Sequence, residues 1–336
     1  MPTQFSSMLY RYCTLAAILL SLSACAPTSG PRSLSAKQEQ ALVIDQHLTE
    51  ADVYIARGLS DSALASFGLA LEENPNLLKA HLGMGDIYRQ HGNFELAKRA
   101  YKRATVVAPN DFRSHYSLAL MHHMLEELKQ SIPIYLKALT LKPNSFEANR
   151  DIAAAYLQLG KPHIALNYNR RATEIDPDQQ SAWTNLGANY AALKQFNDAV
   201  NCYRQAAELG DLDDPVLLGL GDAHTRLGNF DRAITVLASL VRTSPSVTAY
   251  ERLGYAYFKS REFKRALKHF RKALEYDPND ISSLNGVGVC LMTLYIEDGR
   301  ENMVIRNEAV DMWRRSLQVN PEQPRIADFL SRYDQL

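Results

Sequence analysis

The sequence predicts an all-α solenoid made of about eight helix-turn-helix repeats. Prolines recur with a period of about 34 residues, at Pro75, Pro109, Pro143 and Pro177, and the same spacing continues to Pro245. Within each period, apolar residues recur at i, i+3, i+4 and i+7, which is typical of amphipathic helices. A fixed period of this length indicates stacked repeats, because one pair of helices cannot bury its apolar face alone.

The repeats also share residue types at fixed positions. A small residue is followed by an aromatic residue, an alanine, a second aromatic residue and another alanine before the proline. The small residues let the paired helices approach closely, the aromatic residues fill the gaps between neighbours, and proline ends the second helix. The clearest copies are Gly85, Tyr88, Ala97, Tyr101, Ala104 and Pro109; Gly254, Tyr257, Ala266, Phe270, Ala273 and Pro278; and Gly187, Tyr190, Ala199, Tyr203 and Ala206, with Trp183 before them.

These residues, as in "AWTNLGANYAALKQFNDAVNCYRQAAEL", resemble the tetratricopeptide repeat. The resemblance covers about residues 44–321 and implies a right-handed superhelical solenoid. The whole repeat array is expected to span residues 38–323. The units are expected at about 44–77, 78–111, 112–145, 146–179, 180–213, 214–246, 247–280 and 281–323.

The last repeat is nine residues too long. The spacing from Gly254 to Pro278 in the preceding repeat, applied from Gly288, would place the closing proline at Met312, but it stands at Pro321. The insertion lies near 292–308 and extends the first helix of the unit or its turn. It is either a tolerated surface loop or an added contact surface. Residues 324–336 are predicted to form a capping helix over the end of the array.

The N-terminus is expected to be a lipoprotein signal peptide, residues 1–24. Its apolar run, "CTLAAILLSLSA", is shorter than the ~20 residues that span a bilayer. Leu22-Ser23-Ala24-Cys25 resembles the bacterial lipobox, which implies lipidation of Cys25, whereas Ala24-Cys25-Ala26 also fits an ordinary secretory cleavage site. The next stretch, 25–37, is expected to be a flexible tether. Ala26, where an inner-membrane retention signal would have Asp, favours the outer membrane, facing the periplasm.

The sequence offers no sign of catalysis, a cofactor or a metal. Lys plus Arg and Asp plus Glu are both 37, which argues against binding to nucleic acid. Cys13, Cys25, Cys202 and Cys290 have neither zinc nor disulfide spacing. His122, His123, Glu126 and Glu127 could share a metal on one helical face. However, His122 stands where other repeats have a tyrosine, so we expect it to be buried and to pack there. We therefore expect a protein that is not an enzyme.

The resemblance implies that the first helix of each repeat lines a groove that binds protein or peptide segments. The positions on that face form a mixed surface with a modest basic cluster near the middle. A carboxylate clamp of the kind found in cytosolic co-chaperones is not supported, because Pro215 and Gly219 stand where cations are needed. The groove candidates are Lys79, Asp86, Arg89, Arg113, Tyr116, Arg150, Asn185, Asp222, Arg226 and Tyr255.

A lipobox, a short tether and a repeat array together resemble bacterial lipoproteins of tight-adherence (Flp) and type IV pilus assembly. The resemblance implies a membrane-anchored scaffold that assists the assembly of an envelope complex such as a pilus or a secretion system. The alternative is an adaptor that regulates an envelope enzyme of peptidoglycan hydrolysis or polysaccharide export.

Overall fold

The computed structural model describes residues 35–333, so the expected signal peptide and the expected lipidation site at Cys25 lie outside the described residues. The described residues form seventeen α-helices and no strand, as the all-α prediction required. Eight antiparallel helix pairs are followed by one final helix. The helices are α2 (Ala36–Ala56), α3 (Ser60–Glu73), α4 (Leu78–Gln90), α5 (Phe94–Val107), α6 (Phe112–Met124), α7 (Leu128–Leu141), α8 (Phe146–Gln158), α9 (Pro162–Ile175), α10 (Gln180–Ala192), α11 (Phe196–Leu209), α12 (Asp214–Arg226), α13 (Phe230–Thr243), α14 (Val247–Lys259), α15 (Phe263–Tyr276), α16 (Ile281–Glu297), α17 (Met303–Val319) and α18 (Pro324–Tyr333).

The chain divides into two compact units, Met1–Pro75 and Asn76–Leu336. In the first unit, α2 packs against α3 around the buried side chain of Phe67. Helix α2 begins at Ala36, inside the segment expected to be a tether. Its start is fixed by Gln38, whose Oε1 accepts a 2.8 Å hydrogen bond from the backbone N–H of Ser35. This is half of a capping box.

The exposed face of α2 carries both polar and apolar side chains. Leu42 and Val53, on the same face as Gln46, are 57% and 42% exposed. Gln46 and Glu50 are joined by a 2.9 Å hydrogen bond on α2. The positions equivalent to Gln46 in the seven later repeats hold residues that are at most 1% exposed. Gln46 itself is exposed, which distinguishes the first repeat from the later ones. The buried equivalents are Ala80, Ser114, Ala148, Ala182, Val216, Ala249 and Ser283.

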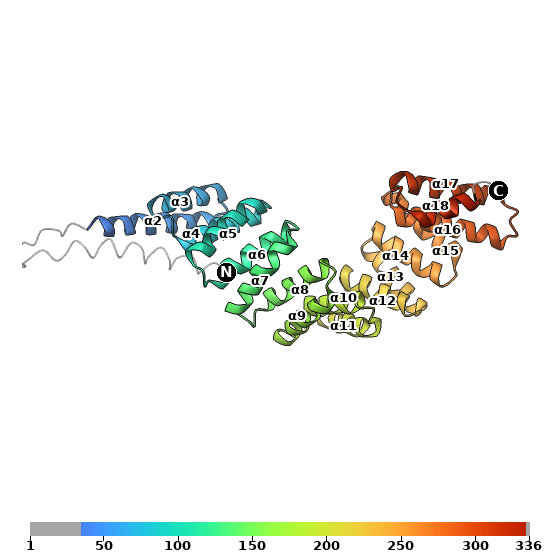
Figure 1. Ribbon diagram of the computed structural model, residues 1–336, viewed down its shortest axis with the longest axis horizontal. Helices are drawn as coiled ribbons and strands as arrows, with labels where there is room; N and C mark the ends of the chain where they lie inside the picture. The colour runs from blue at the N-terminus through green and yellow to red at the C-terminus, as the bar shows by residue number, and fades with distance from the viewer. Residues whose placement is uncertain (1–34, 334–336) are drawn as a thin grey trace, which may run out of the picture. The chain divides into compact units, whose positions relative to one another are not determined.

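In the second unit, successive repeats stack in chain order from α4 to α18 (Figure 1). The second helix of each repeat packs against the first helix of the next repeat, as α5 does with α6. The first helices also contact one another, from α6 with α8 through to α14 with α16. In a curved stack, the helices on the inner side are closer to their equivalents in the next repeat than those on the outer side are. The first helices therefore form the inner layer, and the second helices form the outer layer.

The turns inside the repeats share one backbone conformation. Gly92, Gly160 and Gly228 adopt φ values of 68° to 77°, which glycine adopts without steric cost. At the equivalent position, Glu126, Lys194 and Arg261 adopt φ values of 59° to 64°. These three residues carry the cost of a left-handed backbone conformation, which glycine avoids.

Glycines on the first helices allow aromatic side chains to sit directly against the backbone. Tyr203 lies between Gly187 of its own repeat and Gly219 of the next repeat. A Cβ atom added at Gly219 would be only 2.2 Å from the Tyr203 ring. Phe270 is held in the same way between Gly254 and Gly286. One ring thus fills the space within a repeat and the space between two repeats.

The nine-residue insertion in the last repeat is mainly helical. Compared with α14 (13 residues) and α15 (14 residues), α16 and α17 have 17 residues each, so they gain four and three residues. The turn between the helices has five residues, 298–302, instead of three, 260–262, which accounts for the other two. The insertion therefore lengthens both helices of the last repeat rather than forming a surface loop.

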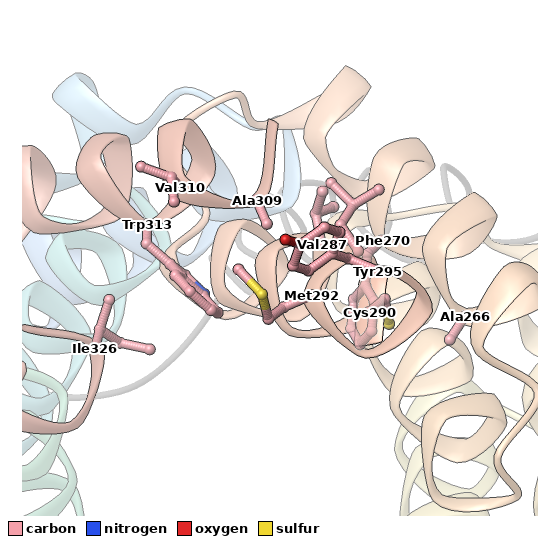
Figure 2. Close-up of a cluster of buried hydrophobic side chains, with 11 residues drawn as sticks. Ala266, Phe270, Val287, Cys290, Met292, Tyr295, Ala309, Val310, Trp313 and Ile326 are labelled. Carbon is pink, nitrogen blue, oxygen red and sulfur yellow. The ribbon is translucent and has the colours of Figure 1, made fainter. Parts of the chain in front are cut away.

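The end of the array is closed by α18. Trp313 and Val310 of α17, Met292 of α16 and Ile326 of α18 belong to one buried cluster (Figure 2). The Trp313 ring lies 5.4 Å from the ring of Phe329. This is the apolar contact that a capping helix must supply at the open end of a solenoid. No helix within residues 35–333 is both long enough and apolar enough to span a bilayer.

Candidate partner-binding groove

The first helices of the second unit present their candidate residues on the inner layer. On α4 and α6 they form a cluster around Asp86. Its Oδ1 accepts a 2.7 Å hydrogen bond from the hydroxyl of Tyr101, and its Oδ2 pairs with Arg113 of the next repeat. Burial, together with the neighbouring Asp86 carboxylate, raises the pKa of Tyr101, so the phenol stays protonated and donates.

A second cluster surrounds Asp151 on α8. Its Oδ2 accepts a 2.7 Å hydrogen bond from the hydroxyl of Tyr116 on α6, and its Oδ1 accepts one of 2.7 Å from Arg150 Nε. The Arg150 guanidinium also lies 5.6 Å from the centre of the Phe146 ring. Arg113 and Arg150, the centre of the expected basic cluster, are therefore each paired with an aspartate. The middle of the groove is electrically balanced rather than basic.

A third cluster lies on α12 and α14. Arg252 Nε is 3.6 Å from Asp222 Oδ2 and 3.3 Å from Glu251 Oε2. Burial raises the pKa of Glu251, whose side chain is 17% exposed. Next to it, Glu251, Tyr255, Phe258 and Asn285 line a cleft of about 190 Å³ between α14 and α16. The cleft combines an apolar wall with one carboxylate and one amide group.

The remaining candidates lie at the margins of these clusters or apart from them. Arg89 is exposed on α4 beside Tyr101 of the first cluster, and Arg226 is exposed at the end of α12 near Asp222 of the third. Lys79 is exposed at the start of α4, and Asn185 is half-buried on α10. The structure thus distributes the candidates along the first helices in three clusters and two further positions. It does not bring them together in one site.

Sequence reasoning missed Asp151, Glu251, Arg252 and Asn285. Glu251 and Asn285 occupy the same helical position as Tyr116 and Arg150, which are among the groove candidates. The repeat register alone could therefore have found these two residues. Asp151 and Arg252 each follow a residue of that position, and their participation depends on side-chain direction, which the register does not determine.

The histidine considered as a metal ligand and the cysteines of the repeats have other contacts in the structure. His122 is half-buried rather than buried, and its Nδ1 lies 2.5 Å from Glu127 Oε2, while Glu127 also accepts a 2.9 Å hydrogen bond from Lys98. Burial raises the pKa of Cys202 to about 11 and that of Cys290 to about 12, so both are inert thiols. Within residues 35–333, no three His, Cys, Asp or Glu side chains are grouped as a metal site requires.

Comparisons with known proteins agree with the arrangement of the helices in repeated pairs. A family model described as tetratricopeptide repeat matches residues 82–146, 184–248 and 218–282. A comparison with curated protein sequences gave no match.

Three solved structures share the fold at low sequence identity. A tetratricopeptide repeat protein from Parabacteroides merdae is 17% identical with a TM-score of 0.59, covering 74% of this chain and 99% of its own. PilF from Pseudomonas aeruginosa is 19% identical with a TM-score of 0.54, covering 66% and 99%. PilW, described as a type IV pilus biogenesis factor, is 21% identical with a TM-score of 0.53, covering 60% and 94%. Together with the repeat period and the eight helix pairs, these matches show that residues 82–146 and 184–282 are tetratricopeptide repeats and that the described residues have the fold of a tetratricopeptide repeat solenoid.

Proposed function

We propose that this protein is a non-enzymatic scaffold that is anchored in a bacterial membrane through lipid on Cys25 and binds protein partners in the groove of its repeats. Its process is the assembly of an envelope complex such as a pilus. The similarity in fold to PilF and to the pilus biogenesis factor PilW supports this process. The lipobox sequence ending at Cys25 supports the anchor.

The observation that carries the binding proposal is the cleft beside Tyr255. Its aromatic wall, formed by Tyr255 and Phe258, can cover an apolar side chain of a partner. Glu251 and Asn285 offer a carboxylate and an amide for hydrogen bonds to the backbone or to a polar side chain of the same segment. A groove that joins apolar area to a few oriented polar groups suits an extended or helical peptide segment.

The anchor is tested by fractionation of cells that express the full chain. Cys25→Ser should move the protein from the membrane fraction to the soluble fraction. Cys202→Ser is the matched control, because this thiol is buried in the repeat core and should leave the distribution unchanged. A Cys25→Ser protein that still requires detergent for extraction would contradict the anchor.

The groove is tested by photocrosslinking in cells. A photoreactive amino acid at Tyr255 should capture pilus or secretion subunits, identified by mass spectrometry, whereas the same probe at Val106, exposed on α5, should not. Capture of a hydrolase or glycosyltransferase at Tyr255 would favour the adaptor alternative. Equal capture at both positions would contradict binding in the groove.

The affinity of the captured partner gives a second readout. Tyr255→Ala should weaken its binding at least about tenfold, because aromatic anchors in a cleft commonly dominate binding energy. The role of charge in the groove is best tested with Arg113→Gln. The alternative, Arg150→Glu, would place a new carboxylate beside the buried Asp151 and disturb the fold itself.

A further inference from the structure

A second cleft lies apart from the one at Tyr255 and is lined by helices of both layers. It has a volume of about 360 Å³ and is formed by α11, α12 and α13. Leu220 and Val236 give it an apolar lining, and Arg204 and Arg232 are exposed at its edge. His224 also lines the cleft, is 4% exposed, and has no hydrogen-bond partner for its Nδ1 within the described residues.

The preceding pair of helices shows what Arg204 lacks. Arg170, the equivalent of Arg204 one repeat earlier, donates hydrogen bonds of 3.0 Å and 3.3 Å to the hydroxyl of Tyr190, and its guanidinium lies 5.8 Å from the centre of that ring. The residue equivalent to Tyr190 in the next repeat is His224. Arg204 therefore occupies the position of a tyrosine-binding arginine beside a repeat that has no tyrosine there.

In the following repeat, the arginine equivalent to Arg232 also contacts a tyrosine. Its equivalent, Arg265, lies over the ring of Tyr257 at 5.8 Å, and Tyr257 also stacks on His269 at 5.2 Å. Tyr257 is again the equivalent of His224, one repeat later. Arg204 and Arg232 thus occupy the two positions whose arginines engage a tyrosine elsewhere in the array, and both line a cleft in which His224 stands in place of that tyrosine.

The charge of the cleft is positive. Neither Arg204 nor Arg232 has a hydrogen bond or an ion pair among residues 35–333, and Asp231 is the one acidic residue of the lining. Burial, and then Arg204 and Arg232, lower the pKa of His224, so its ring is neutral at pH 7. The two guanidinium groups and one carboxylate leave a net charge of one positive unit.

We propose that this cleft binds a tyrosine side chain of a partner protein, with acidic residues on either side of that tyrosine. The ring lies on Leu220 and Val236 between the two guanidinium groups, and Arg204 donates to its hydroxyl as Arg170 does to Tyr190. The flanking carboxylates complement the charge of the cleft. The site shares no lining residue with the cleft at Tyr255 and adds a second contact surface to the solenoid.

The test uses the full-length protein in detergent and the peptide acetyl-Asp-Tyr-Asp-amide. In saturation-transfer NMR, the tyrosine ring protons should show saturable binding, with a Kd on the order of 1 mM or below, as expected for one side chain with ionic contacts. Arg204→Gln and His224→Tyr should each weaken binding at least about tenfold. The second change fills the cleft with the phenol that the neighbouring repeats carry there.

Three controls make the result specific. Arg170→Gln should leave peptide binding unchanged, because its phenol partner is internal, and so should Tyr255→Ala, which alters only the groove. Circular dichroism reports whether each variant is folded. Since Arg204 is exposed, Arg204→Gln keeps the test valid even if His224→Tyr does not fold.

Several results would overturn the proposal. One is the absence of saturable binding to the wild-type protein. Others are equal binding of acetyl-Asp-Ala-Asp-amide, and unchanged affinity in Arg204→Gln. Displacement of the peptide by an equal concentration of inorganic phosphate would indicate a general anion site instead. None of these results depends on whether a partner binds in the groove.

Discussion

The hydroxyl of Tyr116 donates a 2.7 Å hydrogen bond to the carboxylate of Asp151, which lies in the next repeat. Asp151 is 8% exposed, and its other oxygen is bonded to Arg150 at 2.7 Å. A buried carboxylate is stable only when it is paired and hydrogen-bonded. The Tyr116 hydroxyl therefore links the first helices of two repeats through a charge that needs it.

Removing this hydroxyl should loosen the contact between the two repeats. We expect Tyr116→Phe to lower the free energy of unfolding by about 1.5–3 kcal/mol, the usual contribution of a hydrogen bond to a charged group. Urea denaturation followed by circular dichroism measures the change. Tyr156→Phe is the matched control, because this hydroxyl makes no hydrogen bond within residues 35–333 and its ring stacks on Tyr168. Equal losses in the two variants would contradict the role of the Tyr116 hydroxyl.

The contact of Gly219 with Tyr203 leads to a second prediction. Gly219→Ala places a Cβ atom 2.2 Å from the Tyr203 ring, so the ring or α12 must move. Overpacking of this kind costs about 1–3 kcal/mol in the free energy of unfolding. Gly68→Ala in α3 is the control, since nothing lies within 4 Å of its added Cβ, and it should stabilise that helix by about 0.5–1 kcal/mol. A thermal melt of both variants checks the opposite signs, and a tolerated Gly219→Ala would contradict the close contact.

The turn at Lys194 gives a third prediction. Lys194 has φ 62°, whereas Gly160 and Gly228 occupy the same position in the neighbouring repeats with φ 68° and 77°. Lys194→Gly removes the steric cost of this conformation but adds entropy to the unfolded chain, so we expect a gain of about 0.5–1 kcal/mol. The reverse change, Gly228→Ala, should destabilise by a similar amount. Chemical denaturation that found the same sign for both would exclude this explanation.

The repeat period predicted the helices and the core because both depend on local pattern. Each unit repeats the small and aromatic positions, so the pairing of Gly85 with Tyr101 follows from the spacing. The start of α2 at Ala36 was not predicted, because the Pro- and Ser-rich composition led us to expect a tether as far as residue 37. The sequence "SAKQ" at 35–38 nevertheless carries a capping-box signature.

The pairing of charges in the groove could not be predicted in the same way. The register places Arg113 and Arg150 on the inner layer. Whether a guanidinium points to the groove or to a neighbouring aspartate depends on rotamers and on the distance between repeats. The nine-residue insertion is another such case. Its length follows from the spacing of Gly288 and Pro321, but the gain of four residues by α16 and three by α17 depends on how the longer helices pack around Tyr295 and Trp313.

The carboxylate of Glu251 leads to a prediction about pH. Burial raises its pKa in the folded protein above the ordinary 4.5, so the folded state binds this proton more tightly than the unfolded chain does. Between those two pKa values, stability falls as pH rises, and above the folded value the full cost remains. Glu251→Gln cannot ionise, so it should be more stable than the wild type at pH 7, and this advantage should shrink as the pH falls toward 4.

Urea denaturation of the wild type and of Glu251→Gln at pH 7 and at pH 4 measures this difference. Glu174→Gln, whose parent side chain is 61% exposed, is the control and should change stability little at either pH. A Glu251→Gln protein that is less stable at pH 7 would mean that the ion pair with Arg252 outweighs the cost of burial. If the prediction holds, the groove keeps an ionised carboxylate at a cost to the fold. A partner that supplies a cation or a hydrogen-bond donor to Glu251 would recover that cost on binding.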